Sequence, residues 1–258
     1  LAAFRQKLHL AACPDLPSHL SGLDLSLARV DPTRGPALYA ITTDSDGERT
    51  FTYWRKDSAA RQMFALADNA DVLAAGDKVD VLYFSMISLA ILPPEGREIV
   101  FDLCVRVRDG GGRVAFDSNY RSALWDSEKA ARAVHARAIT LVDIGLPTRE
   151  DELSLTGLDD PVAIDRSWRE RGVSEVVVKL GSGGCFANGA IHPVPAPVAP
   201  IDTTGAGDAF NAGYLHARVS GRSIKDSATA GHTLAGYVIT KRGGIPLPSN
   251  DAPYAVLG

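Results

Sequence analysis

The sequence lacks the patterns that mark several broad classes of protein. No run among its 258 residues approaches the ~20 apolar residues of a membrane span, so we expect no membrane contact. Lysine and arginine number 27 against 31 acidic residues, a net charge of −4, which gives no reason to expect a nucleic-acid partner. We find no pattern of a signal peptide, a low-complexity tract or an internal repeat. With 45% hydrophobic and 22% charged residues, the composition is that of an ordinary globular protein.

Cysteine is also scarce. The three cysteines, Cys13, Cys104 and Cys185, are widely spaced and include no CxxC pair. The six histidines show no metal-binding spacing either. We therefore expect reduced thiols in a cytoplasmic protein, with neither a disulfide framework nor a zinc site.

Two common phosphate-binding motifs are absent as well. The sequence contains no GxxxxGK[ST] and no GxGxxG, and it lacks the motif set of protein kinases. If the protein handles a nucleotide, it does so with a different loop.

The most informative segment that is present runs from residue 201 to 210, IDTTGAGDAF. Glycines before a helix let backbone N–H groups approach an anion, and the helix dipole favours negative charge there. Asp208 is out of place at such a site unless it accepts a proton from a hydroxyl that attacks a bound phosphoryl group. Taken alone, a Gly-x-Gly turn is equally common as a purely structural feature.

Two further segments follow buried strands directly, where ligands bind in open α/β sheets. One is KLGSGG, residues 179–184, whose glycines leave room for a nucleotide, although a tight turn into a hairpin would look the same. The other is FDSNYR, residues 116–121, in which Asp117, Asn119 and Arg121 are placed for a ligand. A solvated strand exit is the alternative for this second segment.

A third segment, TYWRKDSAA at residues 52–60, puts Tyr53 and Arg55 on one face of a strand. It pairs with the strand of Tyr39 in an expected hairpin of residues 37–55, around the turn DSDG. Charges that protect an exposed sheet edge are the alternative interpretation.

The periodicity predicts strands alternating with helices, hence a mainly parallel sheet covered on both faces. Strands are expected at 79–85, 113–116, 138–141 and 175–180, and a hairpin at 185–187 and 190–194. Helices are expected at 59–73, 94–108, 123–137, 150–156, 163–171, 208–220 and 223–241.

The segment at 201–210 closely resembles the C-terminal signature of the PfkB, or ribokinase-like, family of carbohydrate kinases. The resemblance implies that Asp208 is the catalytic base and that the backbone of Gly205, Ala206, Gly207 and Asp208 forms an anion hole for the transferred phosphoryl group. It also implies that ATP lies against Lys179, Gly181, Ser182, Gly183 and Gly184, near Asn119, and over Gly205 and Gly207.

Within that family, the segments at 52–60 and 116–121 look like those of the kinases of 2-keto-3-deoxygluconate. This resemblance implies that Tyr39, Tyr53, Arg55 and Arg121 hold the sugar acid, whose carboxylate suits a guanidinium. It implies transfer of a phosphoryl group from ATP to the terminal hydroxyl. A kinase of fructose or ribose is the first alternative, and a non-catalytic sugar- or nucleotide-binding relative is the second.

The segment PTREDE, residues 147–152, is similar to the part of the family that carries an N-x-x-E motif. Glu152 matches the glutamate, which implies an indirect role in ordering Mg²⁺, while Arg149 stands in place of the asparagine. An acidic cluster at a helix start would have the same appearance.

The resemblance implies an α/β fold, the ribokinase-like three-layer sandwich with a mainly parallel central sheet and a small β-sheet lid. We expect residues 1–258 to form a single kinase domain, with residues 37–55 contributing to the lid. The opening strand and glycine motif of the family are not visible, so we expect its N-terminal part to be missing. The family's lids often pair between subunits, which implies a dimer or a higher oligomer.

Overall fold

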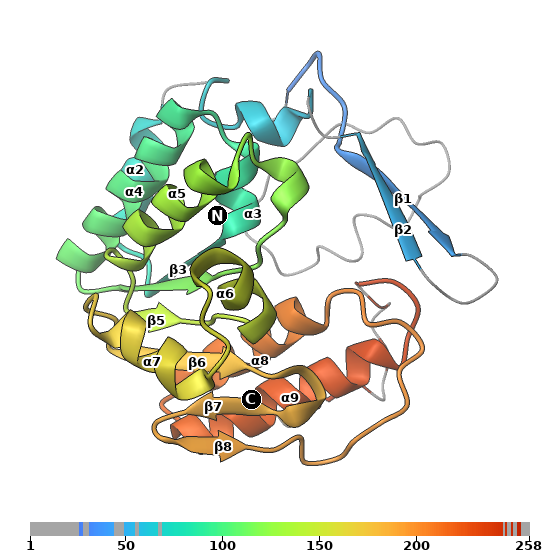
Figure 1. Ribbon diagram of the computed structural model, residues 1–258. Helices are drawn as coiled ribbons and strands as arrows, with labels where there is room; N and C mark the ends of the chain where they lie inside the picture. The colour runs from blue at the N-terminus through green and yellow to red at the C-terminus, as the bar shows by residue number, and fades with distance from the viewer. Residues whose placement is uncertain are drawn as a thin grey trace. The chain divides into compact units, whose positions relative to one another are not determined.

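The structure is a computed structural model that describes residues 26–27, 31–43, 49–54, 57–66, 69–244, 246, 249 and 252–253. For residues 38–43 and 49–54 it describes the backbone alone. The chain divides into two compact units, shown in Figure 1. The first comprises Leu1–Val114 and Tyr120–Leu141, and the second Ala115–Asn119 and Val142–Gly258.

The described part of the chain contains a main sheet of six strands in the order β3-β4-β5-β6-β7-β8. Its strands are β3 (Val81–Ser85), β4 (Arg113–Asp117), β5 (Ile144–Gly145), β6 (Glu175–Lys179), β7 (Cys185–Ala187) and β8 (Ala190–His192). Strands β4, β5 and β6 run parallel, and β7 and β8 return as an antiparallel hairpin. The expected α/β fold with a mainly parallel sheet is therefore confirmed.

In the first unit, α2 (Ala70–Gly76) packs on α4 (Pro94–Asp109), and α4 packs against β3. A short helix α3 (Met86–Ile91) follows β3, and α5 (Glu128–Ile139) follows β4 after a 3-10 turn, η2 (Ser122–Leu124). Ser127 caps α5 by accepting a hydrogen bond from the Ala130 N–H at 3.2 Å. The expected helix from residue 94 is confirmed, with proline in its first turn and glycine beyond its end.

The first unit also contains a separate hairpin, β1 (Leu38–Thr43) and β2 (Arg49–Trp54), paired antiparallel and independent of the main sheet. The sequence predicted this hairpin. Its role as a lid remains a prediction. A 3-10 turn, η1 (Ala59–Gln62), follows it.

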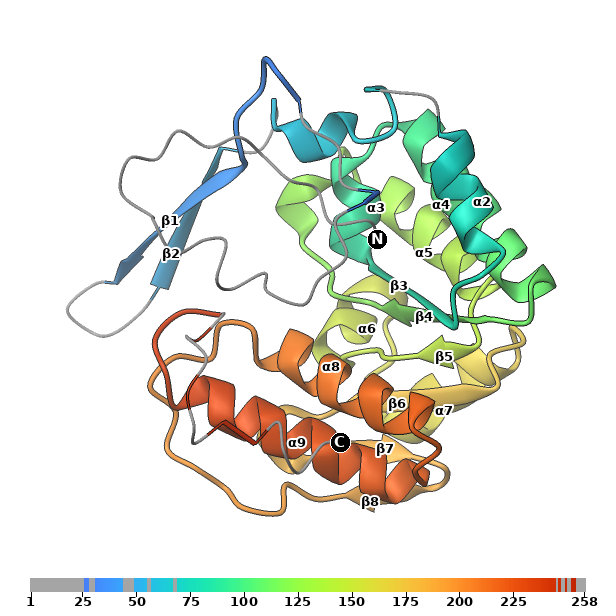
Figure 2. The ribbon, with the colours of Figure 1, turned by 180° about the vertical axis from the view of Figure 1, so that it is seen from behind.

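In the second unit, helices cover both faces of the strands. In Figure 1, α7 (Pro161–Arg169) lies on the viewer's side of the strands. Figure 2 shows the opposite side, which is covered by α8 (Ala206–Val219) and α9 (Ile224–Ile239). The short β5 carries a glycine because a Cβ at Gly145 would lie 2.4 Å from the Trp168 ring of α7. Trp168 in turn stacks on Phe116 of β4, with ring centroids 5.9 Å apart.

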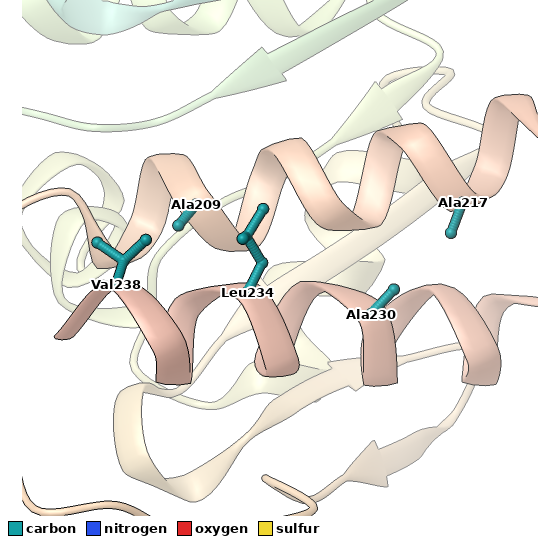
Figure 3. Packing of buried hydrophobic residues seen from close by; sticks show 5 residues of the cluster. All are labelled: Ala209, Ala217, Ala230, Leu234 and Val238. Carbon is teal, nitrogen blue, oxygen red and sulfur yellow. The ribbon is translucent and has the colours of Figure 1, made fainter. Parts of the chain in front are cut away.

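Small residues bring α8 and α9 close together. Figure 3 shows the packed cluster of Ala209, Ala217, Ala230, Leu234 and Val238. A Cβ at Gly213 of α8 would lie 2.8 Å from the Ala230 carbonyl oxygen of α9, so the backbones are nearly in contact there. This pairing gives α8, whose first turn carries the candidate base, a firm support.

Two expected elements were wrong, and one helix was missed. Residues 138–141 are not a strand: α5 continues to Ile139, and the strand is Ile144–Gly145, too short to show a strand periodicity. The expected helix at 59–73 is instead η1 and α2. Helix α3 was not predicted. Its start is marked by Ser88, whose side chain accepts a hydrogen bond from the Ser85 N–H at 3.3 Å.

Candidate active site

The turn before α8 requires glycine at position 205. Gly205 has a φ of 78°, the left-handed region, and a Cβ there would lie 2.7 Å from the Gly244 carbonyl oxygen. The Ala206 N–H donates to the Thr203 carbonyl at 3.2 Å, and the first helical bond runs from the Ala209 N–H to Gly205. The N–H groups in the first turn of a helix have no acceptor within that helix, and such groups are where an anion binds.

Asp202 ties this turn to the segment after α9. Its Oδ1 accepts a hydrogen bond from the Thr204 N–H at 2.9 Å, and its Oδ2 accepts one from the Gly243 N–H at 3.0 Å. The N–H groups of Ile201 and Asp202 both donate to the Ile239 carbonyl, at 2.7 and 3.1 Å. The turn is thus fixed from both sides before any ligand binds.

Asp208 is the third residue of α8 and lies exposed in its first turn, beside the exposed Gly207. An accessible carboxylate next to helix-start amides has the arrangement that a proton acceptor for an attacking hydroxyl requires. The sequence predicted this placement of Gly205, Ala206, Gly207 and Asp208 on one turn.

Beneath the first turn of α8 lies a ring of three buried polar side chains. The Lys179 ammonium donates to Asp117 Oδ1 at 2.9 Å and to Asn211 Oδ1 at 3.2 Å. Asn211 Nδ2 donates to Asp117 Oδ2 at 2.8 Å and so closes the ring. We predicted Lys179 as a nucleotide contact, and the structure directs its ammonium to these two partners.

The end of β4 supplies the polar groups that the sequence suggested. The Asn119 N–H donates to Asp117 Oδ1 at 3.2 Å, and Ser118 Oγ accepts a hydrogen bond from the Thr148 N–H at 3.0 Å. Asn119 Oδ1 is buried and has no hydrogen-bond partner among the described residues. An unsatisfied acceptor at a strand end is available to a donor on a ligand.

The glycine turn after β6 forms the 3-10 turn η3 (Gly181–Gly183). Gly181 and Gly184 have φ values of 58° and 94°, and a Cβ at Gly184 would lie 2.2 Å from the His192 carbonyl oxygen. Gly181, Ser182 and Gly183 are exposed. Tight-turn geometry requires two of the glycines, and the exposed surface of the turn stays open to the predicted nucleotide.

The predicted substrate residues belong to the first unit. Arg121 is exposed, and its Nη1 donates to the Tyr120 carbonyl at 2.7 Å. Tyr39 and Tyr53 are direct partners in the β1–β2 register. Arg55 lies outside the described residues. The contact of these four residues with a sugar acid stays a prediction.

The side chain of Glu152 is turned into the interior of the second unit. It is buried in α6 (Arg149–Thr156), and its Oε2 accepts a hydrogen bond from Trp168 Nε1 at 3.1 Å. In the part of the chain that the structure describes, no three His, Cys, Asp or Glu side chains gather into a metal site. The indirect role of Glu152 in ordering Mg²⁺ stays a prediction.

One residue of this region was not predicted: Asn211. Asp117 was expected near a ligand, and in the structure it accepts hydrogen bonds from Lys179 and Asn211. The signal for Asn211 was a polar residue within the apolar pattern of α8, between Phe210 and Gly213. The ring centroid of His232 lies 4.9 Å from that of Phe210. Burial lowers the pKa of His232.

A parallel sheet with a glycine turn at a helix start, and a carboxylate in the first turn of that helix, has the arrangement of a phosphotransferase. Residues 19–251 match the family described as pfkB family carbohydrate kinase. The chain belongs to this family, and as a carbohydrate kinase it uses ATP. Within the described residues, no helix is both long enough and apolar enough to cross a membrane.

Known relatives agree with this assignment. The chain is 41% identical over 242 residues to the 2-dehydro-3-deoxygluconokinase of Escherichia coli K12, covering 91% of this chain and 78% of that protein. It is 33% identical to a fructokinase of Klebsiella pneumoniae over 213 residues, or 81% of this chain and 66% of that protein. Among solved structures, a Vibrio cholerae fructokinase with bound fructose, ADP and calcium superposes with a TM-score of 0.78 at 26% identity, covering 99% and 84% of the two chains.

Proposed function

We propose that the protein phosphorylates the terminal hydroxyl of 2-keto-3-deoxygluconate, also called 2-dehydro-3-deoxygluconate, at the expense of ATP. The similarity to the Escherichia coli enzyme of that name, at 41% identity over most of both chains, carries the proposal. The arginines at 55 and 121 support it, because an acidic sugar needs cations that a neutral sugar does not.

The reaction is an in-line transfer. The carboxylate of Asp208 accepts the proton of the terminal hydroxyl, whose oxygen attacks the γ-phosphorus of ATP. The bond from that phosphorus to the bridging oxygen breaks, and ADP leaves. Amides at the start of α8 donate to the phosphoryl oxygens as their charge develops, which is the largest stabilising contribution in such sites.

The remaining predicted residues bind and orient. Arg121 and Arg55 pair with the substrate carboxylate, and Tyr39 and Tyr53 donate hydrogen bonds to it or to hydroxyls. The turn at 181–184, with Asn119, borders the nucleotide. Mg²⁺ supplies charge neutralisation on the ATP phosphates when it is bound. The hairpin of residues 37–55 would exclude water as a lid, and we further propose a cytoplasmic dimer or higher oligomer.

A panel of acceptors tests the substrate. Coupled ADP release should give a kcat/KM for 2-keto-3-deoxygluconate at least about 10²-fold above that for fructose or ribose, since a site built for a charged group discriminates strongly. A comparable or higher value for fructose would reject the acid substrate. It would favour the fructokinase function, which the Klebsiella relative and the Vibrio structure suggest. Sugar or nucleotide binding without turnover would favour a non-catalytic relative.

A further inference from the structure

The ring formed by Asp117, Lys179 and Asn211 is almost entirely removed from solvent. These residues are 2%, 7% and 2% exposed, and each makes two of the three side-chain bonds that close the ring. The three come from the end of β4, the end of β6 and the second turn of α8. Polar side chains from three separate elements thus meet at one buried point.

Stability alone gives a weak reason for such a ring. Burying an ion pair costs desolvation that its attraction barely offsets, and apolar residues of similar volume are often as stabilising. What a closed ring of directed bonds does provide is fixed geometry. The carboxylate of Asp117 also cancels the charge of Lys179, so the ring adds little net positive potential to the anion site.

The position of the ring relates it to the chemistry. Asn211 follows Gly207 by four residues and Asp208 by three, so all three lie on neighbouring parts of one helix face. A Cβ at Gly207 would lie 3.9 Å from Lys179 Nζ, which places the ammonium directly against the first turn of α8. The ring therefore joins the turn that carries the candidate base to the carboxyl ends of two strands.

We propose that Lys179 and Asn211 are positioning residues for phosphoryl transfer: through Asp117 they hold the first turn of α8 against the ends of β4 and β6. In this role the ring fixes the positions of the Gly207 amide and the Asp208 carboxylate. The inference rests on the proposed function, and it gives Lys179 a role other than nucleotide contact.

The test is Asn211→Ala, which frees α8 from the ring but leaves the Lys179–Asp117 ion pair in place. We expect kcat to fall about 10- to 100-fold, since small misplacements of reacting groups have effects of that size. The KM values for ATP and for the sugar should stay within about twofold, because no group of this ring binds either molecule in the proposed role.

Tyr214→Phe is the matched control on the same helix. Tyr214 belongs to a second buried network, donating to Glu175 Oε1 at 2.7 Å, while Arg218 Nη2 contacts Glu175 at 2.8 Å. This variant should lower the melting temperature yet keep kcat. If both variants lower kcat in proportion to their loss of melting temperature, the ring is merely structural and the proposal is overturned.

Lys179→Met distinguishes the positioning role of Lys179 from a direct contact with the nucleotide. A rise in the KM for ATP with unchanged kcat, together with a normal Asn211→Ala enzyme, would establish Lys179 as a nucleotide contact and reject the positioning role. A lower kcat in both Asn211→Ala and Lys179→Met supports the positioning role. Should Lys179→Met fail to fold because Asp117 is left buried and unpaired, Asn211→Ala with its control still decides.

A readout independent of turnover separates this inference from the proposed function. Amide hydrogen exchange over residues 205–209 should quicken in Asn211→Ala and stay unchanged in Tyr214→Phe. Unchanged exchange in Asn211→Ala would overturn the proposal even if the wild-type protein proved inactive. If the wild type prefers fructose, the substrate is wrong, and the kcat ratio measured with fructose still tests the ring.

Discussion

Replacing Asp208 with asparagine will lower kcat by about 10²- to 10⁴-fold, the range measured for loss of a general base. Asparagine fills the same space but accepts no proton at neutral pH. The side chain lies exposed in the first turn of α8, so we expect the variant to fold. Steady-state kinetics with ATP and sugar acid, together with a thermal melt, measure both effects.

Asp226→Asn provides the control for that experiment. Asp226 is also the third residue of its helix, α9, and is likewise exposed, with its N–H donating to the cap Ser223 at 3.1 Å. Both substitutions remove a negative charge from a helix N-terminus, which is worth about 0.3–1 kcal/mol of stability. Equal kcat values for the two variants would contradict the assignment of Asp208 as the base.

Arg121→Ala has the second largest expected effect. Removing one side of a charge-assisted pair with the substrate carboxylate should lower kcat/KM for the sugar acid about 30- to 1,000-fold, the equivalent of about 2–4 kcal/mol. A neutral sugar has no carboxylate that could pair with Arg121, so its kcat/KM should change by less than about threefold. The measurement is kcat/KM for both acceptors in the same preparation.

Arg132→Ala controls for the loss of a positive charge from the same unit. Arg132 is exposed on α5 and contacts Glu128 at 3.2 Å, four residues before it on the same helix. The Arg132→Ala variant should leave kcat/KM unchanged for both the sugar acid and the neutral sugar. Equal losses for acid and neutral sugar in Arg121→Ala would show that Arg121 does not recognise the carboxylate.

Much of the site was readable from the sequence because its parts follow the ends of elements. Gly205 is required by a positive φ and by the approach of Gly244, and the carboxylate at Asp208 follows three residues later. The strands that end at Asp117 and Lys179 were predicted from their aliphatic runs, each to within one residue of its end. These are local signals, since each depends on residues adjacent in the chain.

The rest depended on contacts between distant parts of the chain. Asn211 and Asp117 are 94 residues apart, and only folding shows that they share a hydrogen bond. Glu152 has the exposed, acidic surroundings of a helix start in the sequence, yet its carboxylate turns inward to the indole of Trp168. Strand β5 has two residues, and no periodicity can reveal a strand that short.

The most direct test of the central claim is the identity of the product. Protein, ATP and 2-keto-3-deoxygluconate labelled with ¹³C are mixed, and the product is followed by ³¹P and ¹³C NMR. We predict one phosphate ester on the terminal carbon, seen as carbon–phosphorus coupling there and formed in equal amount to ADP. The Asp208→Asn variant should form it about 10²- to 10⁴-fold more slowly. ADP without ester, or ester on another hydroxyl, would contradict it.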